Sequence, residues 1–375
     1  MRIAQVSPLY ESVPPASYGG TERVVSYLTE ELVDQGHDVT LFASADSVTR
    51  ARLMPMCPQA LRLSGSCRDS LSYHYLMLEA VFKARQRFDV IHFHIDYLHF
   101  LLSRHEHLVH VTTVHGRLDL PELAPLHHEF TDMPLVSISD AQRDPLPDSQ
   151  WVATVYHGLP LNLYEFRPEA QNYFAFLGRV SPEKGLDRAI EIAQRTGVPL
   201  KVAAKVDRAD REYFNETIAP LLDSSDVTFV GEIDQAQKND FLGNARALLF
   251  PIDWPEPFGL VMIESLACGT PVVALSRGSV REILDDGETG FMVETVDQAV
   301  EAIATRPPLS RQGCRGAFER RFTAPRMARE YVAIYEKLRA RPREDAGAFV
   351  GGDEVIGRGH QRPGTVLHPG DFRAH

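Results

Sequence analysis

The chain alternates short apolar segments with longer segments in which apolar residues recur every three or four positions. In the first half, residues 21–35 form an amphipathic segment between the apolar runs 3–6 and 39–43. Apolar runs of this length predict buried parallel strands, and the amphipathic segments predict helices that cover both faces of the sheet. Further strands of the first half are predicted at residues 89–94, 111–115, 135–140 and 155–159.

The second half repeats this order after a polar passage that contains proline, residues 161–169. We interpret that passage as a linker between two domains. An amphipathic helix is predicted at residues 186–195, as in the first half. Strands of the second half are predicted at residues 173–178, 200–204, 227–230 and 247–251.

Composition limits the class of protein. With 375 residues, 44% apolar and 24% charged, the chain has the size and composition of a globular protein with two domains. A formal net charge of −12 argues against nucleic acid as a partner. The four cysteines form no C-x-x-C pair, which argues against a disulfide framework and favours a reducing cytoplasm. No run of 18 apolar residues occurs, so we expect no transmembrane segment.

Residues 255–264 carry the most informative chemistry. Glu256 and Glu264 lie eight positions apart, and the apolar segment 260–268 predicts a buried helix that begins after Gly259. The start of such a helix exposes unpaired N–H groups that suit a phosphate. Glu264 is the only charged residue of the segment, and a buried carboxylate needs a partner. That partner is either a neighbouring backbone or basic group, or a ligand hydroxyl such as those of a ribose.

Residues 256–260 followed by Glu264 resemble the E-x-F-G-(x)4-E signature of retaining, nucleotide-sugar-dependent glycosyltransferases of family 4. Residues 267–274 and 287–291 are similar to the helix, strand and loop that follow this signature in the family. The resemblance implies the α/β GT-B fold, in which two Rossmann-like domains with parallel sheets face each other across an interdomain cleft.

The resemblance also implies the domain organisation. Residues 1–165 would form an acceptor-binding domain, and residues 166–322 a nucleotide-sugar-binding domain. An amphipathic helix predicted within residues 323–343 is expected to pack back on the first domain, although its arginines also suit a membrane surface. Residues 344–375 lack periodicity and are predicted to be a flexible tail.

Arg179 and Lys184 lie five positions apart, on a loop at the carboxyl end of the predicted strand 173–178. Two cations there can neutralise a departing diphosphate without a metal ion. Their G-R-(x)4-K-G pattern resembles the diphosphate clamp of the family, and the alternative is solvated surface charge. The set implied for donor binding is Gly19, Gly20, Arg179, Lys184, Glu232, Phe258, Gly259, Leu260 and Glu264.

Gly19, Gly20 and Glu232 are assigned to donor binding because they follow predicted strands at the places where the family binds its donor. The family's glycine pair after the first strand, here Gly19 and Gly20, lies against the donor diphosphate, and the alternative is a plain turn that starts the helix. Glu232 follows the strand 227–230 and is expected to border the nucleotide base.

His115 ends the predicted strand 111–115 and is similar to the histidine of the family's T-x-H strand end, which faces the donor sugar and the acceptor. A neutral imidazole can bond a sugar hydroxyl or relay a proton near pH 7, and a structural histidine is the alternative. Glu256 precedes the predicted helix, where it would meet the sugar. The implied catalytic set is His115, Glu256, Arg179 and Lys184.

His92 and His94 share one face of the predicted strand 89–94 at a spacing that could hold zinc. The alternatives for His94 are a place in the lining of the pocket, at the carboxyl end of the strand, and a structural role in the core or at the surface. No clear carboxylate or cysteine completes the ligand set, no D-x-D motif occurs, and the family needs no metal for its chemistry. We therefore expect no metal and no cofactor besides the donor substrate.

These features predict a retaining glycosyltransferase that moves a sugar from a nucleoside diphosphate sugar, expected to be a UDP-sugar, to a hydroxyl of a saccharide, glycolipid or small molecule. A catalytically silent relative acting as a scaffold or regulatory subunit is one alternative. A nucleotide-sugar epimerase or phosphorylase of similar architecture is another. We expect a cytoplasmic location, with peripheral contact at the inner face of the membrane left open, and the commonest family setting is polysaccharide or glycolipid biosynthesis.

Overall fold

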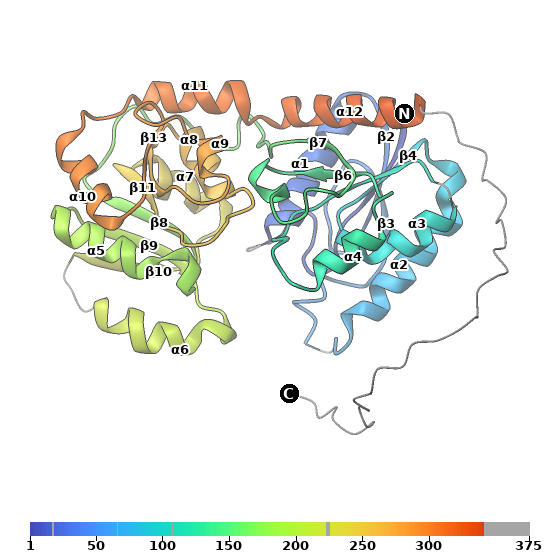
Figure 1. Cartoon of the computed structure of the whole chain (residues 1–375), viewed down its shortest axis with the longest axis horizontal. Coiled ribbons are helices and arrows are strands. Elements are labelled where there is room, and N and C mark those ends of the chain that lie inside the picture. The colour runs from blue at the N-terminus through green and yellow to red at the C-terminus, as the bar shows by residue number, and fades with distance from the viewer. Residues whose placement is uncertain (17–18, 66, 107, 223–225, 341–375) are drawn as a thin grey trace, which may run out of the picture. The chain divides into compact units, whose positions relative to one another are not determined.

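Two parallel β-sheets form the framework of the protein (Figure 1). The computed structural model describes residues 1–340 apart from residues 17–18, 66, 107 and 223–225. The tail predicted at residues 344–375 lies outside the described residues. Met1–Ala340 forms one compact unit that contains both sheets, so the predicted α/β fold is confirmed.

The first sheet has the strand order β3-β2-β1-β4-β5-β6-β7, and all neighbouring strands run parallel. Its edge strand β3 is not predicted from the sequence, because its four residues are only partly buried and carry no clear pattern. We call this sheet with helices α1 to α4 the N-terminal lobe. The strands are β1 Arg2–Val6, β2 Asp38–Ala43, β3 Arg52–Pro55, β4 Val90–Phe93, β5 His110–Thr113, β6 Leu135–Ser137 and β7 Trp151–Thr154.

The second sheet has the order β10-β9-β8-β11-β12-β13 and is also parallel throughout. We call this sheet with helices α5 to α11 the C-terminal lobe. The strands are β8 Phe174–Arg179, β9 Leu200–Lys205, β10 Val227–Gly231, β11 Ala247–Phe250, β12 Val272–Leu275 and β13 Gly290–Val293.

Helices connect the strands in both lobes. Helices α1, α5, α8 and α12 correspond to the four helices predicted from the sequence, and the other helices were not predicted. The helices are α1 Gly20–Asp34, α2 Ser70–Ala84, α3 Phe100–Glu106, α4 Leu123–Glu129, α5 Leu186–Thr196, α6 Arg211–Tyr213, α7 Gln235–Gly243, α8 Leu260–Ala267, α9 Val280–Ile283, α10 Val296–Thr305, α11 Arg311–Arg321 and α12 Ala324–Ala340.

The strand order reverses beside the first strand of each sheet, between β1 and β4 and between β8 and β11. Connections that leave neighbouring strands at such a point run to opposite faces of the sheet, which opens a crevice beyond the carboxyl ends of the strands. His94 and His115 follow β4 and β5, Arg179 ends β8, and Glu256 follows β11. The topology therefore places these candidate residues at the edges where ligands bind.

The strand predicted at residues 155–159 is wrong. The seventh strand is Trp151–Thr154, which pairs with β6, and the chain then leaves the sheet. Leu159 instead pairs with Thr323, where the chain passes from α11 to α12. A Cβ atom on Gly158 would lie 2.3 Å from the Thr323 carbonyl oxygen, so only glycine allows the two segments to approach this closely.

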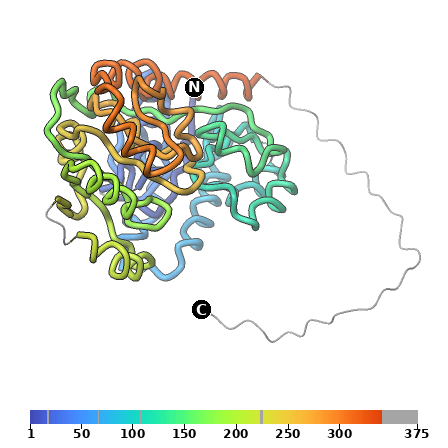
Figure 2. Tube along the Cα trace, turned by 60° about the vertical axis from the view of Figure 1, so that its left-hand side comes forward, coloured from blue at the N-terminus to red at the C-terminus, as the bar shows by residue number. Residues whose placement is uncertain are grey.

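Helix α12 packs against α1 and strand β5 of the N-terminal lobe, and Figure 2 shows this last described helix beside the N-terminus of the chain. The Tyr335 hydroxyl accepts a hydrogen bond from Gln5 of β1 at 3.2 Å and lies 2.7 Å from Nδ1 of His92 in β4. The Tyr331 hydroxyl lies 2.8 Å from Thr113 of β5. Two buried tyrosines thus attach the last described helix to three central strands.

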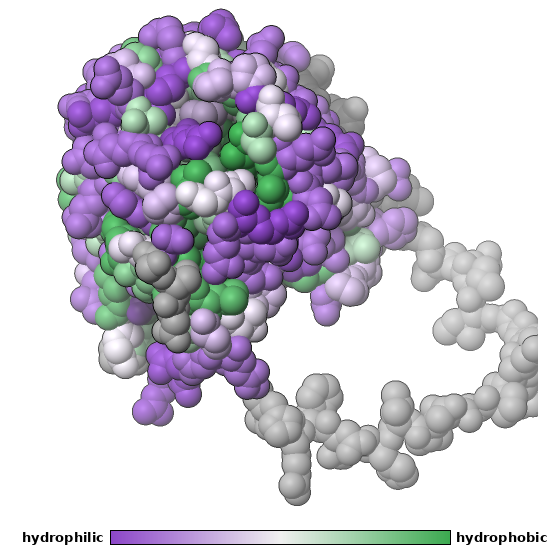
Figure 3. All heavy atoms as spheres, turned by 90° about the vertical axis from the view of Figure 1, so that its left-hand side faces the viewer, coloured by the Kyte–Doolittle hydropathy of each residue, from purple (hydrophilic) through white to green (hydrophobic). Residues whose placement is uncertain are grey.

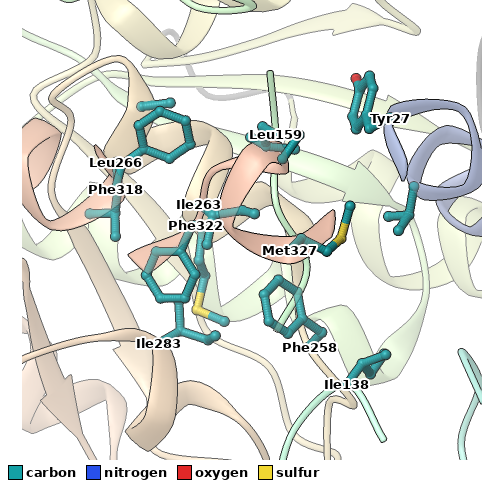
Figure 4. Close-up of a cluster of buried hydrophobic side chains, with 14 of the residues drawn as sticks. Tyr27, Ile138, Leu159, Phe258, Ile263, Leu266, Ile283, Phe318, Phe322 and Met327 are labelled. Carbon is teal, nitrogen blue, oxygen red and sulfur yellow. The ribbon is translucent and has the colours of Figure 1, made fainter. Parts of the chain in front are cut away.

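One hydrophobic cluster includes side chains from both lobes (Figure 4). In it, Leu159 of the N-terminal segment and Met327 of α12 lie in the same cluster as Phe258, Ile263 and Phe318 of the C-terminal lobe. All five are nearly inaccessible to solvent, and burying a large apolar side chain contributes about 2 kcal/mol. This shared core anchors the residues around the start of α8.

Hydrophilic side chains predominate on the face shown in Figure 3, with smaller hydrophobic groups between them. Exposed ion pairs add to the hydrophilic surface elsewhere, for example Arg50 with Glu30 at 2.7 Å. Across the described ranges, no helix combines the length and the apolar character that a membrane span requires.

Candidate active site

A cleft of about 700 Å³ lies at the carboxyl ends of the strands of both sheets. All the residues predicted for donor binding and catalysis line it, although they come from loops far apart in the sequence. They are Gly19, Gly20, His115, Arg179, Lys184, Glu232, Glu256, Phe258, Gly259, Leu260 and Glu264. The structure thus brings the whole predicted set together, while the role of each residue stays a prediction.

The N-termini of α1 and α8 meet in this cleft. A Cβ atom on Gly20, the first residue of α1, would lie 3.7 Å from the side chain of Leu260, the first residue of α8. Neither helix has a side-chain cap, and both are preceded by glycine. Gly259 has φ 76°, where a side chain would also approach Met262 within 2.8 Å. Two uncapped helix starts present N–H groups and partial positive charge to one point, which suits an anion.

Lys184 and Glu256 form an ion pair in the cleft. Lys184 Nζ bonds Oε2 of Glu256, and the same oxygen accepts a hydrogen bond of 2.9 Å from the indole nitrogen of Trp254. The Lys184 ammonium lies 4.9 Å from the centre of the Trp254 ring, within the range of a cation–π contact. The two predicted catalytic residues are therefore held against each other by an aromatic side chain.

Arg179 lies among carboxylates of its own lobe. It bonds Glu183 at 2.6 Å, and Asp210 and Asp207 lie 3.7 and 4.0 Å away. The guanidinium is partly exposed, so these pairs contribute little to stability and can be exchanged for another anion. Arg179 lines the cleft together with Glu183.

Glu264 has a basic partner, one of the two possibilities left open by its sequence. Lys238 of α7 donates to both carboxylate oxygens, at 2.9 and 3.2 Å. Burial alone would raise the pKa of Glu264, but the charge of Lys238 and its hydrogen bonds outweigh burial and lower that pKa below its ordinary value. A carboxylate can accept about four hydrogen bonds, so this pairing leaves acceptor positions for a ligand hydroxyl.

Uncharged histidines line the N-terminal side of the cleft. Gln5 Oε1 lies 2.8 Å from His94 Nε2, and His94 Nδ1 lies 2.8 Å from His115 Nε2. Because the amide oxygen only accepts, His94 donates from Nε2 and accepts at Nδ1, and His115 donates from Nε2. Burial lowers the pKa of His115 to about 3 and that of His94 well below its ordinary value. Both rings are therefore neutral near pH 7.

His92 is fully engaged in the protein. Its Nδ1 lies 2.7 Å from the Tyr335 hydroxyl, and its Nε2 lies 2.7 Å from the Thr113 hydroxyl. A zinc ion on His92 would have to displace one of these bonds. Among the residues that the structure describes, no group of three or more His, Cys, Asp or Glu side chains is arranged to hold a metal ion.

Phe258 lines the cleft at the start of α8. Its side chain is 2% exposed and packs against His157, with 4.7 Å between the ring centres. The side chain therefore fixes the start of α8 in the core beside the cleft. Glu232, by contrast, is exposed at the end of β10.

Among the cleft residues that sequence reasoning missed are Asp96, Lys238 and Trp254. Asp96 adopts a left-handed backbone conformation with φ 49°, which is rare outside glycine and is often found at functional sites. Asp96 lines the cleft. Desolvation by the surrounding protein raises the pKa of its carboxyl group to about 6. An aspartate two positions after a His-x-His strand end was the available signal for Asp96, and a tryptophan two positions before Glu256 was the signal for Trp254.

Comparison with known proteins gives the family. The sequence profile described as Glycosyl transferases group 1 matches residues 165–306, and the profile described as Glycosyltransferase Family 4 matches residues 18–176. A phosphatidyl-myo-inositol mannosyltransferase of Mycolicibacterium smegmatis is 28% identical over 337 residues, which covers 79% of this chain and 82% of the relative.

Solved structures agree on the fold. The glycosyltransferase AviGT4, involved in avilamycin A biosynthesis, superposes with a TM-score of 0.71 at 23% identity, over 91% of this chain and 99% of its own. Anabaena Alr3699/HepE in complex with UDP-glucose superposes with a TM-score of 0.68 at 17% identity, over 90% of this chain and all of its own. The chain thus belongs to the family-4 glycosyltransferases and has their GT-B fold.

Proposed function

We propose that this glycosyltransferase moves a sugar from a nucleoside diphosphate sugar to a hydroxyl of a saccharide, glycolipid or small molecule, with retention of configuration and without a metal ion. The observation that carries the proposal is the meeting of two uncapped helix N-termini beside Lys184 and Arg179. Together they offer a diphosphate both fixed dipoles and mobile cations.

Cleavage of the bond between sugar and diphosphate develops negative charge on the leaving phosphate and positive charge on the sugar. Lys184, Arg179 and the N–H groups at the starts of α1 and α8 would stabilise the leaving group in the transition state. These groups can balance the charge of a diphosphate, so the proposed reaction needs no metal ion.

The sugar would lie between Glu256 and His115, on opposite sides of the cleft. Oε2 of Glu256 bonds Lys184 and Trp254, and Oε1 would accept a sugar hydroxyl. His115 is neutral near pH 7, so it would act through hydrogen bonds and not through charge. We assign no carboxylate as a nucleophile, and propose front-face attack in which the leaving phosphate takes the acceptor proton.

A UDP-sugar is the proposed donor. The support comes from HepE, which shares the fold and was solved with UDP-glucose. In this chain the base would lie near Glu232, and the ribose near Glu264 and Lys238. The acceptor would enter from the side of the N-terminal lobe. Acceptor selectivity would then lie in the loops of this lobe, because loop side chains can change without disturbing the fold.

Thermal unfolding of the purified protein with UDP, GDP or ADP in the presence of a chelator tests the proposal. A ligand that binds the native state raises its melting temperature, so we expect a rise with UDP that the chelator leaves unchanged. A rise that appears only with added divalent metal would refute metal independence. No rise with any nucleotide would favour a scaffold or regulatory protein.

A further inference from the structure

Trp254 makes two contacts with the pair Lys184–Glu256 that no other described side chain makes together. Its indole N–H donates to Oε2 of Glu256 at 2.9 Å, and its ring lies 4.9 Å from the Lys184 ammonium. We propose that Trp254 is a positioning residue, which holds Glu256 with Oε1 toward the donor sugar and Lys184 toward the diphosphate. This inference rests on the proposed function.

The indole N–H limits how the ion pair can form. Without it, the carboxylate of Glu256 can turn and give both oxygens to Lys184, as Glu264 gives both of its oxygens to Lys238. A carboxylate in that arrangement offers less to a sugar hydroxyl, and a lysine in that arrangement has fewer N–H groups for a phosphate. In the described structure both hydrogen bonds of the Glu256 side chain use Oε2. Trp254 thus keeps Lys184 on Oε2 of Glu256 and leaves Oε1 for the sugar.

The indole ring restricts Lys184 in the same way. A lysine side chain is flexible and loses conformational freedom when it is held in one geometry. The cation–π contact with Trp254 lies on the C-terminal side, and the guanidinium of Arg117 from the N-terminal lobe lies 5.5 Å from the centre of the same ring. Trp254 therefore also meets a cation from the other lobe.

The backbone that carries Trp254 is fixed on both sides. Arg188 donates to the Pro251 carbonyl at 2.9 Å, and Ser279 N–H donates to the Glu256 carbonyl at 3.0 Å. A Cβ atom on Gly278 would lie 2.5 Å from the Glu256 backbone nitrogen, so the two loops are in close contact. A loop held this firmly can place an indole N–H with the accuracy that positioning requires.

Trp254→Phe tests the inference, because phenylalanine keeps an aromatic face and removes the N–H. Trp151, the other tryptophan of the chain, supplies the matched control. Its indole also donates one hydrogen bond, to the Leu146 carbonyl at 2.9 Å, and Arg143 lies 5.5 Å from its ring centre. We expect W254F to lower kcat with UDP-glucose by roughly 100-fold relative to W151F, and to weaken the binding of UDP by a smaller factor. Equal kcat values in W254F and W151F would overturn the inference.

A measurement without any donor separates this inference from the proposed function. Urea unfolding of W254F, Glu256→Ala and the double variant forms a double-mutant cycle. If Trp254 holds Glu256, the two single losses of stability add up to more than the loss in the double variant. Additive losses would overturn the inference whatever the protein transfers, and the binding of UDP by the wild-type protein tests the proposed function independently.

Discussion

On the C-terminal side of the cleft Lys184 and Lys238 each bond a carboxylate, whereas on the N-terminal side His94 and His115 bond one another with both rings neutral. An ion pair can exchange one carboxylate for another anion, such as a phosphate, with little change in net charge. A neutral imidazole pair can bond hydroxyls without attracting a charged group. Under the proposed function, the cations of these ion pairs would take part in binding the charged diphosphate, and the neutral histidines would bond the uncharged sugar and acceptor.

The contrast can be tested first on the C-terminal side of the cleft, which we call the charged side. Replacing Lys184 with alanine removes a cation that we assign to the leaving diphosphate, so kcat/KM should fall about 10³-fold. Lys184 is partly exposed, and its substitution leaves the hydrophobic core intact. Steady-state kinetics with UDP-glucose measures the first effect, and thermal unfolding checks the fold.

Lys83→Ala is the matched control for this variant. Lys83 is an exposed lysine of α2 that pairs with Glu79 at 2.9 Å and does not itself line the cleft. It should retain the wild-type kcat/KM. Near-normal activity in Lys184→Ala with an intact fold would remove Lys184 from the diphosphate site.

The charged side was also the more predictable one from sequence. Arg179, Lys184, Glu256 and the helix after Gly259 belong to short continuous motifs, in which spacing along the chain fixes geometry. Parallel strands and amphipathic helices follow from local hydrophobic patterns. Most strands of both sheets could therefore be predicted, together with the residues at their carboxyl ends, whereas β3 and β7 could not.

The remaining features depend on contacts between distant segments. Lys238 meets Glu264 only because α7 packs beside α8, and His115 meets His94 only because β4 and β5 are neighbours. The sequence predicts a strand at residues 155–159, whereas β7 spans Trp151–Thr154. The apolar residues continue past Thr154, but the residue pairs between β6 and β7 end at Thr154. Partners of this kind are set by tertiary packing, which a single sequence does not display.

A buried ion pair on the charged side should respond strongly when one partner is removed. Lys238→Met leaves the buried carboxylate of Glu264 without its main hydrogen-bond donor, so the free energy of unfolding should fall by about 3 kcal/mol. Adding Glu264→Gln removes the stranded charge and should recover a large part of this loss. Urea unfolding of both single variants and the double variant measures the two effects. A double variant no more stable than Lys238→Met would show that the loss has a cause other than the unpaired charge.

The N-terminal side of the cleft, which we call the neutral side, can be tested through the pH dependence of the free energy of unfolding. The folded-state pKa of His115 is about 3, below its ordinary value of 6.5, so between these values the unfolded chain binds a proton that the folded protein does not. Stability is therefore lost as pH falls through this window, by up to about 1.4 kcal/mol per pH unit for this one ring. His115→Gln cannot take up that proton and should lose less stability on acidification.

The comparison of slopes is the decisive measurement for the neutral side. The free energy of unfolding, measured with urea from about pH 6 to about pH 4, should fall less steeply in His115→Gln than in the wild-type protein. His128→Gln, at an exposed position of α4, should keep the wild-type slope because folding hardly changes its surroundings. Equal slopes in all three proteins would mean that the folded protein also binds a proton at His115 in this pH range, which would contradict a neutral His115.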